Sequence, residues 1–177
     1  GVFEMQGSGL VEVINPSQIF ISQRAINSTG SVVVATMEGT RPLLVEVQAL
    51  VSRAGFVGTP RRQSIGFDHG RVAILLAVLD QRAGLHLEGQ DVYVNVAGGV
   101  RVVEPAADLG VALAIASSFR NHALDPELCI IGEVGLSGEV RRVSRIEARL
   151  AEAAKLGFNR ALIPKANCTE CTNNVRL

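Results

Sequence analysis

Two short motifs, each placed directly before a predicted helix, constrain the fold of this chain more than any other feature. The first motif, Glu104–Gly110, has the sequence EPAADLG and leads into a helix of small apolar residues. The second motif, Gly132–Val140, has the sequence GEVGLSGEV and leads into a helix from Ser144. Proline is favoured at a helix start and an acid there is stabilised by the helix dipole, so we place Pro105 and Asp108 in a first turn.

Apolar runs separated by turn residues predict an α+β fold in which helices pack on a mixed β-sheet. Ser31–Thr36 and Leu43–Leu50 indicate a hairpin with a loop of about five residues. A helix capped by Asp68 and ended by Gly84 follows, and its middle is apolar nearly all round, so it should lie buried between layers. Further strands are expected at Leu10–Ile14, Ile19–Ile21, Asp91–Val96, Leu128–Val134, Glu139–Val143 and Ala161–Ile163, and further helices at Pro105–Arg120 and Ser144–Leu156.

Three of these elements carry more detailed expectations. Alternation along Leu10–Ile14 predicts a strand with one well-buried side. Leu128–Val134 is expected to pair with Glu139–Val143. Ser144 and Glu147 have the spacing of an S-x-x-E capping box, in which both side chains satisfy free amides at the helix start.

Two groups of arginines are candidate contacts for DNA phosphates. The chain has 17 basic and 17 acidic residues, so its net charge favours no class of partner, and any affinity for DNA must be local. The first group lies in residues 47–67, which contain no acid and whose glycines and proline predict an exposed loop. The second lies on a predicted strand beside Glu139, and contact between subunits is an open alternative for both groups. The candidates are Arg53, Arg61 and Arg62 in the first group and Arg141 and Arg142 in the second.

Other features set the broad class of the chain. No apolar run reaches the roughly 18 residues that a membrane span needs, so no membrane contact is expected. The chain starts at Gly1 without a basic-then-apolar leader, which predicts that residues 1–177 are one domain of a longer protein. Cys168 and Cys171 form a lone C-x-x-C pair, and zinc sites normally need a second pair of ligands, so no metal site is expected and the role of the pair stays open.

The two motifs, in this order, resemble those of the proteolytic domain of Lon proteases. In that family a Pro-Ser-Ala sequence at the first motif supplies the nucleophile, and a lysine just inside the helix after the second motif is its base. In this chain Ala106 stands at the position of the serine and Glu147 at that of the lysine. Covalent catalysis needs a hydroxyl or thiol beside a group that takes its proton, which a methyl group and a carboxylate cannot provide. The resemblance therefore implies a Lon-type fold without catalytic residues.

Nearly the whole chain, from Gly1 to Pro164, also resembles the C-terminal domain of the RadA (Sms) family of bacterial recombination proteins. The strings that carry this resemblance include Gly1–Met5, Asn15–Ser17, Glu38–Pro42, Pro60–Arg62, Leu75–Leu79 and Asn95–Val100.

The RadA-family resemblance implies more than this domain. It implies a parent protein with a zinc-binding module and a RecA-like ATPase, and hence with ATP, Mg and Zn as cofactors. It also implies a cytoplasmic ring-shaped homo-oligomer, a hexamer, that acts on single-stranded or branched DNA together with a RecA-type recombinase. The chain itself contains no G-x-x-x-x-G-K-[ST] loop, so we expect it to bind no cofactor and to hydrolyse no ATP.

Two alternatives remain open at this point. One is a working Lon-like serine peptidase with a relocated dyad, for which Ser144 and Lys155 are the candidates. The other is a Lon-like domain of a magnesium-chelatase-type ATPase, which shares an Asp-Leu helix start. The absence of the serine and the lysine favours a non-enzymatic scaffold and DNA-contacting domain over the first alternative.

Overall fold

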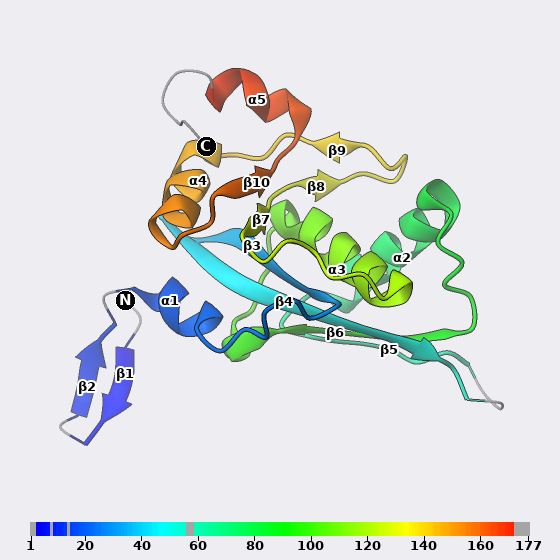
Figure 1. Cartoon of the computed structure of the whole chain (residues 1–177), viewed down its shortest axis with the longest axis horizontal. Coiled ribbons are helices and arrows are strands. Elements are labelled where there is room, and N and C mark those ends of the chain that lie inside the picture. Colours follow the sequence, from blue (N-terminus) through cyan, green and yellow to red (C-terminus); the bar gives the residue numbers. More distant parts are fainter. Residues whose placement is uncertain (1–2, 8, 14, 56–58, 172–177) are drawn as a thin grey trace.

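The computed structural model describes residues 3–7, 9–13, 15–55 and 59–171 of the chain. Its centre is a six-stranded mixed sheet with the strand order β10-β7-β3-β4-β6-β5 (Figure 1). Strand β4 is antiparallel to both of its neighbours, β3 and β6. The outer strands are parallel to the strands that they join: β7 to β3, β10 to β7, and β5 to β6. The strands are β3 (Ser31–Glu38), β4 (Arg41–Arg53), β5 (Arg62–Ile65), β6 (Gln90–Val96), β7 (Leu128–Ile130) and β10 (Arg160–Leu162).

Helices cover the two faces of this sheet to different extents. One face packs against α2 (His69–Ala83) and α3 (Asp108–Arg120) and forms the larger core cluster. The opposite face packs against α1 (Pro16–Ile21) and α4 (Ile146–Lys155), which cover β7, β3 and the first half of β4. The predicted class, helices packed on a mixed sheet, is confirmed.

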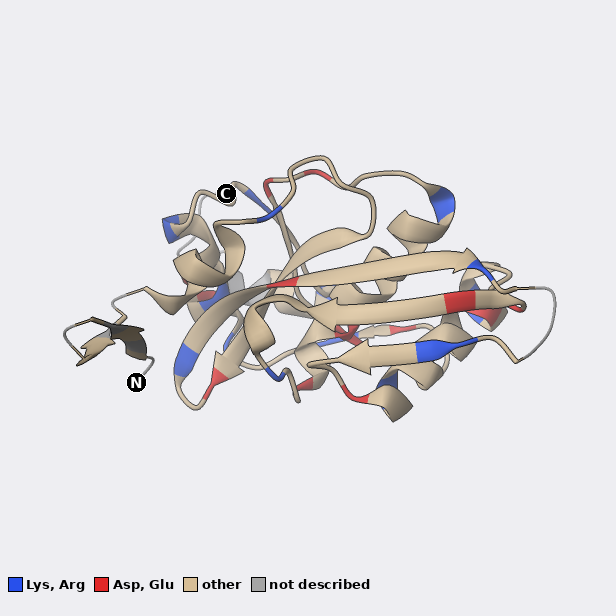
Figure 2. Cartoon of the chain, turned by 90° about the horizontal axis from the view of Figure 1, so that it is seen from below, with Lys and Arg blue, Asp and Glu red and all other residues tan. Residues whose placement is uncertain are grey.

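The second half of β4, together with β6 and β5, has one face that no helix covers (Figure 2). Leu50 on β4 and Ile65 on β5 are 61% and 67% exposed on this face, on either side of the half-buried Tyr93 of β6. We call this surface the open sheet face, and it consists of Gln48, Leu50, Ser52, Gln63, Ile65, Asp91, Tyr93 and Asn95.

The smaller elements complete the chain. The first two strands form a separate hairpin that projects from the body of the molecule (Figure 1). Another two-stranded sheet and two 3₁₀ turns connect the larger elements. These elements are β1 (Phe3–Gln6), β2 (Gly9–Glu12), η1 (Ala97–Gly99), η2 (Pro105–Ala107), β8 (Glu133–Val134), β9 (Val140–Arg141) and α5 (Lys165–Cys171). Among the described residues, no helix is long and apolar enough to cross a membrane.

The segment Ile19–Ile21, expected to be extended, is instead the end of helix α1. The Asn15 side chain accepts a hydrogen bond from the amide of Gln18 (3.3 Å), and Pro16 occupies the first helical position. An Asn cap followed by proline is a helix start, because it satisfies one free amide and removes another. This cap outweighs the strand preference of the apolar residues that follow it.

Two predicted strand connections also differ in the structure. The turn between β3 and β4 is only Gly39–Thr40, because the strands pair as far as Glu38 and Arg41. The single strand expected at Leu128–Val134 divides into β7, which joins the large sheet, and β8, which pairs with β9. The break lies at Gly132, whose backbone forms hydrogen bonds with Ala106 and Leu109 and not with a neighbouring strand.

Burial was overestimated at two elements. Val11 and Leu10 of β2 are 40% and 68% exposed, so the strand has no well-buried side among its described residues. Helix α2 buries one face only, because Ile74 and its neighbours on the outer face are exposed. The reason is common to both elements, since the tertiary packing leaves one of their apolar faces without a covering layer.

The predicted capping box at Ser144 and Glu147 is wrong. Helix α4 begins at Ile146, two residues later than expected, and its cap residue is a left-handed Arg145 (φ 55°) that makes no side-chain capping bond. The Ser144 carbonyl instead accepts a hydrogen bond from Nε of Arg149 (3.0 Å). The chain turns into the helix through Arg145, so Ser144 cannot reach the amide that the pattern assigned to it.

Candidate functional site

The structure brings the two motifs of the sequence into direct contact at Ala106. This residue lies in the turn η2, is 5% exposed, and its carbonyl accepts a hydrogen bond from the amide of Gly132 (2.8 Å). The Gly132 carbonyl in turn accepts from the amide of Leu109 (3.0 Å). An added Cβ at Gly132 would lie 3.0 Å from side-chain atoms of both Leu109 and Val140, a tighter contact than most Cβ atoms make, so the close approach of the motifs favours glycine there.

The two positions of the expected dyad hold groups without nucleophilic or basic chemistry. Ala106 presents a buried methyl group, and Glu147 lies exposed in the first turn of α4. A carboxylate in that turn is stabilised by the helix dipole, which is sufficient reason for its presence. Neither side chain can attack a carbonyl carbon or accept the proton of an attacking hydroxyl as a lysine amine would.

A buried ion pair joins Glu104, which precedes Ala106 by two residues, to Arg149 of α4. Nη1 of Arg149 donates to Oε1 of Glu104 (2.6 Å) and Nη2 donates to Oε2 (2.7 Å), a bidentate geometry. Nη1 also donates to the carbonyl of Ala35 on β3 (2.6 Å), and the amide of Met37 donates to Oε1 of Glu104 (2.6 Å). The Arg149 side chain is 1% exposed and that of Glu104 23%, so the pair ties α4 and the first motif to the edge of the hairpin β3–β4.

The pKa of Glu104 lies below its ordinary value. Burial alone raises the pKa of this carboxyl, but the hydrogen bonds and positive charge of Arg149, with bonds from Thr36 and the amide of Met37, outweigh that effect. Because the folded pKa is depressed, the ionised carboxylate stabilises the fold at pH values above the ordinary pKa of 4.5. This contribution is lost as the pH falls through the folded value.

We therefore expect the Glu104→Gln variant to be destabilised relative to wild type at about pH 7, and the difference to shrink towards about pH 3. Urea unfolding of both proteins across this range measures the difference. Glu147→Gln is the matched control, since it removes an exposed carboxylate of α4 and should show no comparable trend. A Glu104→Gln difference that stays constant with pH would contradict this role of the ionised carboxylate.

A second buried ion pair joins Arg71 of α2 to Asp108 at the start of α3. Nε of Arg71 donates to Oδ1 of Asp108 (2.9 Å), and Nη2 donates to Oδ2 and to the carbonyl of Val134 (3.1 Å). Oδ2 also accepts from the amide of Val134 (3.1 Å). The hydrogen bond with Asp108 raises the pKa of Arg71, although burial opposes it. Asp108 is thus a fully buried partner of α2 and β8 as well as the predicted first-turn acid.

A shallow groove with a volume of about 190 Å³ runs beside the two ion pairs. The described residues that line it carry no hydroxyl, thiol or imidazole group, and the two acids of the first motif on its wall, Glu104 and Asp108, are held in ion pairs. The groove can therefore accommodate a chain segment or a small molecule but offers it no nucleophile. Its lining residues are Phe67, Asp68, Arg71, Val102, Val103, Glu104, Pro105 and Asp108.

The relocated dyad also finds no geometric support. Ser144 precedes α4 and Lys155 is its last residue, so the full helix separates them, a distance of about 14 Å along the axis. The Lys155 side chain is 72% exposed and its Nζ lies 3.8 Å from a carboxylate oxygen of Glu152. An amine separated from Ser144 by the full length of the helix cannot take the proton of its hydroxyl.

The structure brings Arg53, Arg61 and Arg62 to one end of the sheet. Register pairs Arg53 with Gln90 and Arg62 with Val92, on either side of β6. Figure 2 shows basic and acidic segments side by side at this end.

Residues 47–67 contain no acid, but acids from other parts of the chain lie close to two of these arginines in the folded protein. The amide of Arg61 donates to Oδ1 of Asp91 (2.7 Å), and Arg62 lines a groove together with Asp80 and Glu88. Acids from α2, β6 and the loop before β6 thus lie near Arg61 and Arg62 and partly offset their positive charge.

Arg141 on β9 is largely neutralised by its neighbours. Its Nη2 and Nε donate to Oε1 of Glu139 (2.6 and 2.8 Å), and Nη1 lies 3.9 Å from Glu133. The hydrogen bond with Arg141 lowers the pKa of Glu139. Arg142 follows on the same rim and also takes part in an interaction of its own. The assignment of these residues to DNA stays a prediction.

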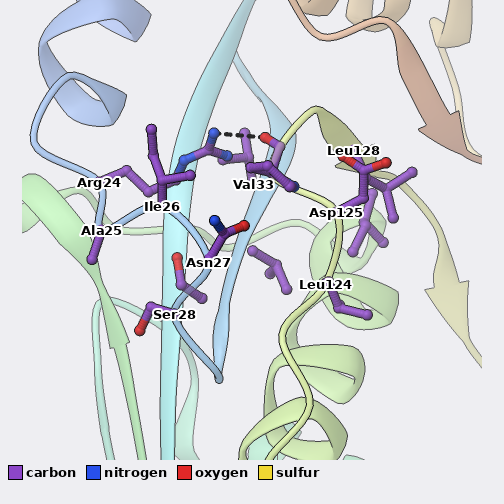
Figure 3. Close-up of a pocket in the computed structure, with 13 residues that line it drawn as sticks. Arg24, Ala25, Ile26, Asn27, Ser28, Val33, Leu124, Asp125 and Leu128 are labelled. Atoms are coloured by element: carbon purple, nitrogen blue, oxygen red, sulfur yellow. Dashed lines mark hydrogen bonds between the residues drawn. The ribbon is translucent and has the colours of Figure 1, made fainter.

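The cysteines and a crevice near the β7 edge offer no further chemistry. Burial raises the pKa of Cys129 to about 12, which leaves its thiol protonated and inert at neutral pH. Cys168 is exposed, and the side chain of Cys171 lies outside the described residues; within those residues no group of three His, Cys, Asp or Glu could hold a metal ion. The crevice around Asn27 (Figure 3), where Arg24 donates to the carbonyl of Pro126 (2.6 Å), measures about 10 Å³, room for one water molecule.

Two arginines that form the ion pairs of the site, Arg149 and Arg71, were not identified from the sequence. A signal existed for Arg149, because it lies three residues after Ile146 and one before Leu150, on the face of α4 that these apolar residues form. A charged side chain on such a face requires a buried partner, which Glu104 provides. Arg71 gave no such signal, since its side chain begins on the partly exposed side of α2.

Comparisons with known proteins point in one direction. The model of a family described as subunit ChlI of Mg-chelatase matches residues 45–167. The chain is 60% identical over 167 residues to a DNA repair protein RadA of Halalkalibacterium halodurans and 59% identical over 167 residues to that of Bacillus subtilis. It is 54% identical over 172 residues to the RadA protein of Streptococcus pneumoniae. These matches cover 94%, 94% and 97% of the chain but only 36%, 36% and 41% of the relatives, so the chain spans well under half of their length.

Proposed function

We propose, from the premise that this chain belongs to the RadA family of DNA repair proteins and to the family described by the ChlI model, that it is a non-proteolytic scaffold domain with a Lon-type fold. The observation that carries the proposal is the filled site at the meeting of the two motifs. Where a peptidase of this type needs a serine and a lysine, the chain has Ala106 and Glu147, and the ion pairs Glu104–Arg149 and Arg71–Asp108 occupy the surroundings.

The wider function belongs to the longer protein. We propose that the parent is a ring-shaped, ATP-driven motor of cytoplasmic DNA recombination and repair that moves DNA branches, a hexamer that acts with a RecA-type recombinase. ATP, Mg and Zn would then be held by parts of the protein outside these residues. The alternative of a magnesium-chelatase-type ATPase, which rests on the Asp-Leu helix start, gains support from the family model, but identities of 54–60% to RadA proteins favour the repair protein.

The scaffold proposal predicts that the domain hydrolyses no peptide bonds. Incubation of the chain with unfolded casein and with a fluorogenic peptide should give no turnover above buffer, because neither motif supplies a nucleophile. Ser144→Ala is the informative variant. Turnover by the wild type that disappears in Ser144→Ala would overturn the scaffold proposal in favour of a relocated peptidase.

Self-association is the scaffold role that the open sheet face supports. Leu50 and Ile65 are exposed there around Tyr93, with a polar rim that includes Gln48 and Asn95. An apolar centre with a polar rim is the composition of contacts between protein subunits. A ring requires head-to-tail contacts, in which this face would meet a different surface of the next copy.

We also propose that Arg53, Arg61 and Arg62, which lie together at one end of the sheet, contact DNA. In the assembled full-length protein, Arg61→Ala/Arg62→Ala should weaken binding to single- and double-stranded DNA. The slope of log affinity against log salt should fall by roughly one unit for each phosphate that the variant no longer neutralises. Sequence preference should not change. Fluorescence anisotropy across a salt series measures both quantities.

Arg160→Ala is the matched control, because this exposed arginine is already paired with Asp125 and lies on β10, at the opposite edge of the sheet from β5. Sedimentation of every variant must precede the DNA measurement. An unchanged affinity and salt slope in the double variant would remove these arginines from the DNA interface, and a smaller particle would assign them to subunit packing.

A further inference from the structure

The β1–β2 hairpin carries an apolar face that the described part of this chain does not cover. Met5 pairs directly with Leu10 across the hairpin, and Phe3 lies two residues from Met5, so all three side chains share one face. They are 55%, 74% and 68% exposed for Phe3, Met5 and Leu10. Three large apolar side chains at this exposure on adjacent strands form a patch that a soluble protein normally buries.

The hairpin is also unsupported by the rest of the domain. Within the described residues its hydrogen bonds are those of its own ladder, and neither core cluster contains one of its residues. Figure 1 shows it projecting away from the sheet and helices. An isolated two-stranded hairpin is at best marginally stable in water, because it lacks a second layer to bury its apolar face. A surface from elsewhere that covers this face would therefore stabilise the hairpin.

The segment that follows the hairpin is, by contrast, fixed rigidly. Pro16 and Ser17 of α1 are buried, and the Ser17 hydroxyl accepts from the amide of Leu44 (3.0 Å) and donates to Glu152 (3.1 Å). Helix α1 is thereby joined to β4 and to α4, the helix that carries Arg149. Whatever covers the hairpin is therefore connected through a very short segment to the helix layer beside the two motifs.

We propose that the apolar face of the hairpin packs against an apolar surface of the part of the full-length polypeptide that lies outside these 177 residues, and so couples that part to this domain. The chain accounts for 36% of the length of RadA relatives, so the remainder is large enough to provide such a surface. Its covalent connection gives it a high effective concentration at the hairpin, which a separate molecule lacks. This inference is independent of DNA contact and of the loss of peptidase chemistry.

The test is hydrogen exchange of residues 3–12 in the full-length protein. In the wild type these amides should exchange at least about tenfold more slowly than in the Met5→Lys/Leu10→Lys variant, because the charges prevent docking and open the hairpin. Leu136→Lys is the matched control, since Leu136 is 71% exposed in the turn between β8 and β9. It should leave exchange of the hairpin unchanged, and unchanged exchange of β3 and β4 in all variants verifies that the domain remains folded.

Each other outcome overturns the proposal. Rapid exchange of residues 3–12 in the wild-type full-length protein would mean that nothing covers the hairpin. Slow exchange that is lost when the protein is diluted to monomers would assign the covering surface to a second copy. Neither result affects the DNA and peptidase measurements, so failure of this inference is distinguishable from failure of the proposed function.

Discussion

Replacing Arg149 by methionine should lower the free energy of unfolding by about 3 kcal/mol, a large share of the stability of a domain of this size. The variant leaves the carboxylate of Glu104 without its bidentate partner and the carbonyl of Ala35 without its donor. Breaking a buried pair costs about 3–5 kcal/mol, and the lower end applies because the Glu104 side chain keeps 23% exposure. Urea unfolding of the chain at neutral pH measures the loss.

The double variant Arg149→Met/Glu104→Gln separates the charge from the packing. It removes the unpaired carboxylate but keeps an oxygen that can accept from the amide of Met37, so it should be more stable than Arg149→Met alone. Arg141→Met is the control for an exposed pair and should change the stability by less than about 1 kcal/mol. Equal losses in the single and double variants would show that the charge of Glu104 is not what destabilises Arg149→Met.

Gly30→Ala should destabilise the chain by roughly 3–5 kcal/mol, because a methyl group cannot be placed there without moving backbone. Gly30 has a left-handed backbone (φ 79°), and an added Cβ would clash with the carbonyl oxygen of Ala49. That carbonyl belongs to β4, and the amide of Ala49 donates to Gly30 (2.7 Å) while the amide of Gly30 donates to the hydroxyl of Ser117 (2.9 Å). The change therefore disturbs the start of β3, β4 and the end of α3 together.

Gly39→Ala isolates the conformational part of this effect. Gly39 in the β3–β4 turn is also left-handed (φ 60°), but no atom would lie within 4 Å of its added Cβ. Its replacement should cost only about 1–2 kcal/mol, the penalty for a left-handed alanine. Thermal or urea unfolding of the two variants side by side measures the difference, and equal losses would contradict the steric clash at Gly30.

The helices with strong end signals were predictable, and those with weak ones were not. Asp68 and Gly84 marked α2 because the cap bonds to the amide of Arg71 and glycine adopts the left-handed end. Helix α1 was missed because the apolar residues after Asn15 and Pro16 suggested a strand. An Asn cap followed by proline is nevertheless also a signal for the start of a helix. The start of α4 was misplaced because a left-handed Arg145 has no recognisable signal in sequence.

The candidate site divides in the same way. Pattern and resemblance were sufficient to predict that Ala106 and Glu147 stand at the two dyad positions, where they cannot act as a nucleophile and its base. They could not reveal what occupies the place, because Glu104 and Arg149 are 45 residues apart and meet only when α4 packs on the hairpin β3–β4. They also could not show the acids around Arg61 and Arg62, since Asp80, Glu88 and Asp91 come from elements distant in the chain.

The sequence by itself determined the class of fold, the hairpin β3–β4, the helices after the motifs and the absence of a serine and a lysine at the two dyad positions. These features depend on local signals such as periodicity, caps and residue identity, which do not depend on contacts between distant segments. Only the tertiary structure decided which charges are paired, which face of the sheet stays open and that the β1–β2 hairpin projects uncovered. Those properties depend on contacts between segments far apart in sequence, where burial and distance set the energy of each charge and each apolar face.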